Sequence, residues 1–144
     1  MKKFLILVVI IFVIIQFIPI DKTNPINDDK LALIVNDKEV KNLLKTTCYD
    51  CHSNHTVWPN YSNIAPFSFV ISNHVKDGRK AINFSEYENI KLDIKKKRVE
   101  RAIQLIKNQM MPPSSYTWIH KDAILNKEQK DKLINFFQKE LNRL

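Results

Sequence analysis

The chain has 144 residues, a formal net charge of +8 and 26% charged residues. Its single glycine disfavours a sheet-rich fold, because tight hairpins usually need glycine. A basic chain can bind nucleic acid or anionic lipid. The joint abundance of Lys, Ile and Asn is instead typical of biased codon usage, so we expect no nucleic-acid partner.

The N-terminal segment has the pattern of a membrane anchor. Lys2 and Lys3 precede an apolar run over residues 4–20, which as a helix at about 1.5 Å per residue spans roughly 25 Å. A cleaved signal peptide would need a small-x-small site, and residues 14–27 hold no Ala, Gly or Ser. We therefore expect residues 1–20 to form an uncleaved, single-pass anchor in the inner (cytoplasmic) membrane. The positive-inside rule then places the rest of the chain on the periplasmic side.

After the anchor we expect a polar tether over residues 21–36 and one domain over residues 37–144. The first helix of this domain begins near Asn36 or Asp37, and Asn36 with Glu39 has the spacing of a capping box. Its apolar face leads to the two cysteines, which we expect at or beyond the end of the helix.

Three further helices follow. Pro66 suits the first turn of the second helix, and Gly78 is placed to end it. Its apolar stripe consists of Phe67, Val70, Ile71, His74 and Val75. The third helix covers about residues 93–108, with the lysine run 95–97 on its solvated side. The last begins after Asn126, which has capping-box spacing to Gln129. The pattern predicts an all-α domain whose helices surround one bulky ligand.

The sequence Cys48-Tyr49-Asp50-Cys51-His52 is a Cys-x-x-Cys-His run, the attachment signature of a c-type haem. Each thiol can add to a haem vinyl group, and the imidazole that follows can reach the iron from one side. Both cysteines of the chain are used here. We therefore expect one covalent haem, bound by Cys48 and Cys51 and ligated by His52.

The second axial ligand is the main open choice. A methionine sulfur is a soft ligand that favours ferrous iron, and Met110 and Met111 precede two prolines that stiffen their loop. We favour Met111 because it abuts the prolines. His74, Met110, His55 and an open position remain the alternatives, whereas His120 has no supporting context.

Other side chains are candidates for the haem pocket. Trp58, Tyr61 and Tyr116 have apolar rings with a polar tip that could meet a propionate, although ordinary core packing explains them equally well. Arg79 is a candidate propionate partner, and a plain surface arginine is the alternative.

The run over residues 48–68 resembles the bacterial haem-binding domain family with a Cys-x-x-Cys-His motif. Further similar motifs are Asn73-His74-Val75, Gly78-Arg79, Asn83-Phe84-Ser85, Met111-Pro112 and Tyr116. The resemblance covers residue 40 to the C-terminus and implies a small helical domain like a mono-haem cytochrome c. It implies haem attachment at Cys48 and Cys51 with His52 as the proximal ligand. Asn60 departs from the pattern, where a second aromatic is expected.

We expect a one-electron carrier with His/Met-ligated iron rather than an enzyme. Its partners would be a redox protein, which the sequence does not name, and the inner membrane through the N-terminal helix. The alternatives are a haem-based peroxidase or sensor with an open or histidine sixth position, a zinc-binding domain, and a thiol–disulfide oxidoreductase.

Overall fold

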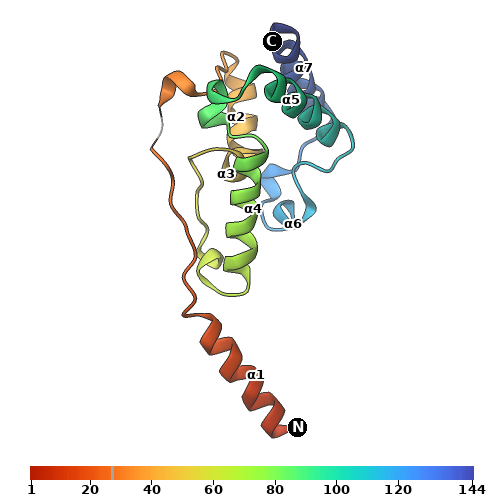
Figure 1. The fold of residues 1–144 in the computed structure, drawn as a ribbon. Helices are drawn as coiled ribbons and strands as arrows, with labels where there is room; N and C mark the ends of the chain where they lie inside the picture. Colours follow the sequence, from red (N-terminus) through yellow and green to blue (C-terminus); the bar gives the residue numbers. More distant parts are fainter. Residues whose placement is uncertain (27) are drawn as a thin grey trace.

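The computed structural model describes residues 1–26 and 28–144, and every regular element in this part of the chain is helical (Figure 1). This confirms the expected all-α fold. The α-helices are α1 (Lys2–Ile15), α2 (Lys38–Thr47), α3 (Tyr49–His52), α4 (Phe67–Ala81), α5 (Leu92–Lys107), α6 (Ser114–Thr117) and α7 (Lys127–Arg143). Short 3-10 helices are η1 (Asp29–Leu31), η2 (Asn60–Asn63), η3 (Phe84–Asn89) and η4 (Lys121–Ala123).

The core forms where α5 and α7 pack together and α2 lies against α7. The 3.6-residue periodicity of α5 and α7 predicts their buried faces correctly, since Val99, Ile103, Leu133 and Phe137 are all buried. Segments from elsewhere complete the core cluster, which comprises Leu33, Val40, Leu44, Ile82, Phe84, Tyr87, Val99, Ile103, Ile106, Leu133 and Phe137.

The N-caps predicted for α2 and α7 can be compared with the structure. Asn126 and Gln129 form a full capping box at the start of α7, as expected. At α2 the expected cap is wrong by one residue. The carboxylate of Asp37, not Asn36, accepts the backbone N–H groups of Glu39 and Val40. Both residue types can cap a helix, so the sequence pattern leaves the choice between them open.

The lysine run 95–97 is only partly solvated, which corrects the expectation for Lys95. This side chain is buried, its ammonium lies 2.7 Å from the carboxylate of Glu88, and it sits 4.6 Å above the ring centroid of Tyr87. A buried charge needs such a partner to offset the loss of hydration. Lys95 therefore belongs to the packing between α5 and η3.

Helix α4 does not end at Gly78, as the sequence suggests, but continues to Ala81. Gly78 is instead a point of close approach. A Cβ atom built on it would lie 2.3 Å from the carbonyl oxygen of Cys51 and 2.9 Å from the Cβ of Cys51. The glycine is therefore required by packing against α3, not by a helix stop.

The expected transmembrane anchor over residues 1–20 is wrong, and so is the inner-membrane localisation that rested on it. Helix α1 ends at Ile15, so its apolar part after Lys3 rises only about 18 Å. The side chain of Gln16 then bonds the backbone of Ala65, donating to its carbonyl at 3.2 Å and accepting its N–H at 2.9 Å. Among the described residues, no helix combines the length and apolarity needed to cross a membrane.

The segment after α1 runs beside the loop that precedes α4 (Figure 1). Asn24 donates to the carbonyl of Thr56 at 3.0 Å, and the hydroxyl of Ser72 donates to the carbonyl of Asp21. Leu33 is buried and its N–H bonds the carbonyl of Phe84. The described part of the predicted tether thus packs on the domain, while residue 27 lies outside the described residues.

We predict that Gly78→Ala destabilises the protein by about 1–3 kcal/mol, because α4 must move away from Cys51 to admit the methyl group. At an ordinary helix position the same change would stabilise by up to about 1 kcal/mol. Thermal unfolding followed by circular dichroism measures the sign. Asn73→Ala, at an exposed position of α4, is the control and should be near neutral. A stabilised Gly78→Ala protein would contradict the close approach.

Candidate functional site

The Cys-x-x-Cys-His turn lies where α2 gives way to α3. Cys48 is the C-cap of α2, and its carbonyl accepts the N–H groups of Cys51 at 3.2 Å and His52 at 2.9 Å. Residues three apart on one helical turn lie on the same side, so the two thiols are neighbours. Both thiols are free and partly buried. The turn therefore presents two thiols and one imidazole from a single rigid turn of helix.

The thiols are poorly suited to disulfide exchange. Burial raises the pKa of Cys48 and Cys51 to about 11, and the nearby Asp50 carboxylate adds to the shift at Cys51. An oxidoreductase needs the opposite shift, since the thiolate is the nucleophile. No cluster of three or more His, Cys, Asp or Glu side chains that could hold a metal occurs in the described part of the chain. The zinc and thiol–disulfide interpretations thus find no support at this turn.

His52 is oriented by the end of α4. Its Nδ1 lies 3.1 Å from the carbonyl oxygen of Ile82, and its ring centroid lies 6.0 Å from that of Phe84. Because the partner is a carbonyl, Nδ1 must carry the proton, which leaves the Nε2 lone pair for a metal. Burial lowers the pKa of His52, although hydrogen bonds to the backbone of Ile82 and Gly78 oppose the shift. The imidazole is therefore held neutral, the form that ligates iron.

Met111 leaves α5 through a defined helix end. Gln109 has a left-handed backbone (φ 56°), its N–H bonds the carbonyl of Ile106, and the N–H of Met110 bonds the carbonyl of Leu105. These two bonds form a Schellman motif. After it Met110 is 56% exposed, whereas Met111 is partly buried against the core cluster. Of the two methionines, only Met111 is turned toward the interior.

The rival histidines lie elsewhere. His74 is exposed on α4, and its predicted companions Phe67 and Val70 are exposed as well. The buried face of α4 instead carries Val75 and Gly78 together with Ser68. The predicted apolar stripe is therefore correct only in part. His55 is exposed in the loop after the turn.

The predicted pocket aromatics Tyr61 and Tyr116 meet at His120, a residue with no supporting context in the sequence. The Tyr61 hydroxyl lies 2.6 Å from Nε2 of His120, and the Tyr116 ring stacks on the His120 ring with centroids 4.2 Å apart. The Tyr116 hydroxyl donates to Oδ2 of Asp50 at 2.8 Å. We call Asp50, Tyr61, Tyr116 and His120 the Asp50 clasp. The one sequence signal for His120 is its spacing of four residues from Tyr116, which places the two rings together on a helical turn.

The carboxylate of Asp50 is shared between two loops. Its Oδ1 accepts the N–H of Val57 at 3.0 Å while Oδ2 accepts the Tyr116 hydroxyl. Burial and the bond to Asp50 hold the pKa of Tyr116 well above its usual value. Tyr116 therefore remains a protonated donor. The sequence pattern indicates no role for Asp50 beyond its place inside the motif.

Two buried polar atoms follow the turn in sequence and are suited to a haem. Nε1 of Trp58 and Oγ of Ser62 are buried and have no hydrogen-bond partner among the described residues. A buried donor without a partner is costly. Haem propionates are carboxylates that accept such bonds. The donor set of Cys48, Cys51 and His52 and these two orphaned groups therefore fit a covalently held haem.

Arg79 binds the protein itself rather than standing free. Its Nε donates to the carbonyl of Ser53 at 2.9 Å and its Nη1 to the carbonyl of Thr23 at 3.0 Å. Its Nη2 donates to Oδ1 of Asn24 at 2.8 Å and to Oγ1 of Thr56 at 3.0 Å. Four bonds leave one of the five N–H groups of a guanidinium for the predicted propionate contact. Arg79 therefore links residues 53–56 to the N-terminal segment at Thr23 and Asn24.

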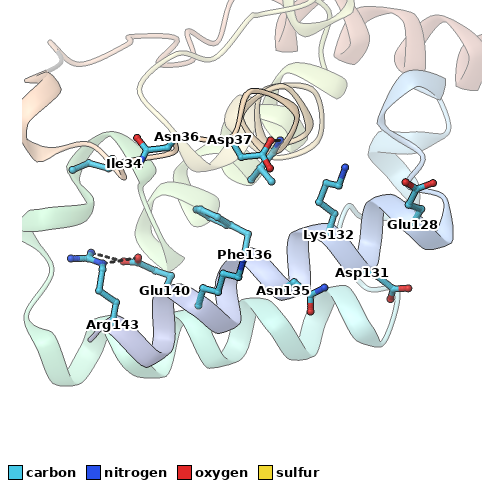
Figure 2. Close-up of a pocket in the computed structure, with 12 residues that line it drawn as sticks. Ile34, Asn36, Asp37, Glu128, Asp131, Lys132, Asn135, Phe136, Glu140 and Arg143 are labelled. Carbon is cyan, nitrogen blue, oxygen red and sulfur yellow. Dashed lines mark hydrogen bonds and ion pairs between the residues drawn. The ribbon is translucent and has the colours of Figure 1, made fainter.

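A groove of about 730 Å³ lies between residues 34–40 and α7 (Figure 2). Ile34 and Phe136 supply apolar surface, and Glu140 and Arg143 pair along one side with a distance of 2.7 Å. None of the predicted haem-site residues lines this groove. The candidate site is therefore the Cys-x-x-Cys-His turn with its surrounding loops.

A family model described as a haem-binding domain matches residues 10–139 of the chain. This is most of the chain, and it confirms the family resemblance drawn from the run at residues 48–68. Neither the curated proteins nor the solved structures yielded a match.

We predict that Arg79→Lys lowers the free energy of unfolding by about 1–3 kcal/mol, because an ammonium cannot replace the four directed bonds. Urea unfolding measures the change, and limited proteolysis should cut residues 21–26 faster. Lys80→Ala, at the exposed neighbouring position, should alter neither. Equal stability of Arg79→Lys and wild type would show that these bonds contribute nothing.

Proposed function

The chain belongs to the haem-binding domain family and is a haem-binding protein, and we propose that it holds one covalent haem c and carries single electrons. The observation that carries the proposal is the hydrogen bond from Nδ1 of His52 to the Ile82 carbonyl, beside two free thiols on the same turn. When bound, the haem supplies an iron that accepts and releases one electron.

Cys48 and Cys51 are the proposed attachment residues. Each S–H would add across a vinyl group, with sulfur bonding the carbon next to the ring and the proton going to the terminal carbon. The rigid turn keeps the thiols in a fixed relation to His52, since the Cys48 carbonyl bonds both following N–H groups. Attachment and ligation are thereby coupled through one short segment of backbone.

The pocket residues have separate proposed roles. His52 provides the proximal nitrogen, and the Ile82 carbonyl keeps its ring orientation. Trp58 supplies for a propionate a buried N–H donor that has no partner among the described residues, and Tyr61 follows it by three residues in the same loop. Arg79 supports this loop through Ser53 and retains one N–H for the propionate.

Met111 is the proposed sixth ligand. Its side chain packs toward the core, while that of Met110 is turned out and His74 is exposed on α4. Thioether sulfur raises the reduction potential by favouring ferrous iron. A closed sixth position suits electron transfer to a redox partner protein, because a peroxidase or sensor needs access to the iron.

Attachment is tested by Cys48→Ser with Cys51→Ser, in a protein expressed with a cytochrome c maturation system. Wild type should keep its haem through denaturing electrophoresis and acid–acetone extraction, and the double variant should lose it completely. Tyr49→Phe, which lies between the cysteines and leaves both thiols in place, is the control and should retain haem. A wild-type protein of unmodified mass would refute covalent attachment while leaving haem binding itself intact.

Sixth ligation is tested by Met111→Ala. The oxidised wild type should show the weak near-infrared charge-transfer band of sulfur-ligated ferric haem, and Met111→Ala should abolish it. The reduction potential should fall by on the order of 0.1 V, within the roughly 0.8 V that axial ligands span.

Met110→Ala and His74→Ala are the matched controls and should preserve both the band and the potential. Loss of the low-spin spectrum in His74→Ala alone would establish bis-histidine ligation. A high-spin wild type that binds carbon monoxide or peroxide readily would establish an open position, and the electron-carrier proposal would give way to a peroxidase or sensor.

A further inference from the structure

We infer that the Asp50 clasp positions Met111: the hydrogen bond from Tyr116 to Asp50 ties the methionine loop to the haem-attachment turn and keeps the sulfur at the sixth position. The inference rests on the proposed His/Met ligation. It assigns positioning roles to Asp50 and His120, neither of which touches the proposed iron.

The clasp joins the two segments that carry the proposed axial ligands. Asp50 precedes His52 by two residues, and Tyr116 follows Met111 by five. Their side chains meet at 2.8 Å between the Tyr116 hydroxyl and Oδ2 of Asp50. This hydrogen bond therefore links the proximal and distal sides of the proposed site, and the Tyr116 hydroxyl also lies 3.4 Å from the carbonyl oxygen of Thr46 on α2.

Both ends of this bond are held in place. On one side, Oδ1 of Asp50 accepts the N–H of Val57, and the Asp50 carbonyl accepts the hydroxyl of Thr56 at 2.7 Å. On the other side, the N–H of Tyr116 bonds the carbonyl of Pro113 at 3.0 Å. Motion of the tyrosine relative to the turn is thus restricted from both directions.

His120 extends the clasp to a third segment. Its ring stacks on Tyr116 at an interplanar angle of 14°, and its Nε2 meets the Tyr61 hydroxyl at 2.6 Å. Tyr61 belongs to η2, in the loop that leads from the attachment turn to α4. The imidazole therefore braces Tyr116 against the far side of the same loop that Asp50 holds.

A positioning role follows from the weakness of a thioether ligand. An added ligand such as imidazole must compete with the Met111 sulfur. It can bind only those molecules in which the loop has moved the sulfur away from the iron, so its apparent affinity is reduced in proportion to the fraction of molecules in this open state. A hydrogen bond to a charged group stabilises by more than a neutral one. Removing it should raise the open population about tenfold or more.

The test is Tyr116→Phe in the haem-loaded full chain. This change removes the hydroxyl and retains the ring on His120. We expect imidazole to bind the ferric protein about tenfold more tightly, a change of 1.4 kcal/mol, with a weakened near-infrared sulfur band. Tyr87→Phe removes a buried tyrosine hydroxyl in the core and should leave both quantities unchanged. Circular dichroism confirms that each variant is folded.

Two further variants separate positioning from general loosening. Asp50→Asn should also increase the imidazole affinity about tenfold. The double variant with Tyr116→Phe should again show an increase of about tenfold rather than a hundredfold, because the two changes remove the same hydrogen bond. In a Met111→Ala background, Tyr116→Phe should change imidazole affinity less than twofold. A tenfold effect that persists without Met111 would overturn the inference, since the clasp would then control access to the site rather than the sulfur.

The outcomes also distinguish this inference from the function on which it rests. A wild type with the sulfur band whose imidazole affinity is unaffected by Tyr116→Phe overturns the clasp and leaves the His/Met carrier standing. A wild type without the sulfur band overturns the His/Met ligation, and the clasp with it.

Discussion

The structure depends on the close contact of α4 with the Cys-x-x-Cys-His turn. Gly78 brings the helix so near that a Cβ atom would overlap the carbonyl of Cys51. Ile82 follows Gly78 by four residues and lies on the same side of the helix end, where its carbonyl meets Nδ1 of His52. One helix face thus sets both the seating of the cysteine turn and the orientation of the imidazole. A bulkier residue at 78 would disturb both at once.

Around this contact, polar side chains hold the loops that the helices do not. Arg79 lies next to Gly78 and bonds the carbonyl of Ser53 and the hydroxyl of Thr56. Asp50 holds the same loop from inside the turn through the N–H of Val57. The loop after the cysteines is therefore fixed at several points although it contains only a short 3-10 helix. Such support is what a preformed cofactor site requires, because its geometry must not relax with each change of charge.

The sequence predicts those features that depend on local chemistry. The periodicity of α5 and α7 identifies their buried faces, and the Asn126 capping box begins α7 as expected. The position of the two cysteines at the end of the preceding helix is likewise predicted correctly, because the motif is contiguous, and haem attachment there stays a prediction. At α2 the prediction misses by one residue, since Asn36 and Asp37 are both competent caps and the sequence pattern does not choose between them.

The other misses depend on contacts between separate elements of the structure, which the pattern within one helix does not contain. Lys95 is buried because Glu88 and the Tyr87 ring lie above it. The hydrogen-bond partner of the His120 ring is the hydroxyl of Tyr61, which is 59 residues away in the sequence. The apolar run after Lys3 suggests a membrane span, but its helix stops where Gln16 bonds the backbone of Ala65. The apolar composition does not predict this helix end, because the residue that Gln16 binds lies 49 positions further along the sequence.

The end of α5 determines which of the two methionines faces the core, and therefore which one can be the proposed sixth ligand. Gln109 takes the left-handed conformation that glycine usually occupies in a Schellman motif, at a cost on the order of 1 kcal/mol for a residue with a Cβ atom. The motif reverses the chain within two residues, so Met110 faces solvent and Met111 faces the core. Continuing the helix by one more residue would rotate the following side chains by about 100° and so change the direction of both methionines. The hydrogen bonds to the carbonyls of Leu105 and Ile106 offset the strain at Gln109, and the resulting turn directs Met111 to the core.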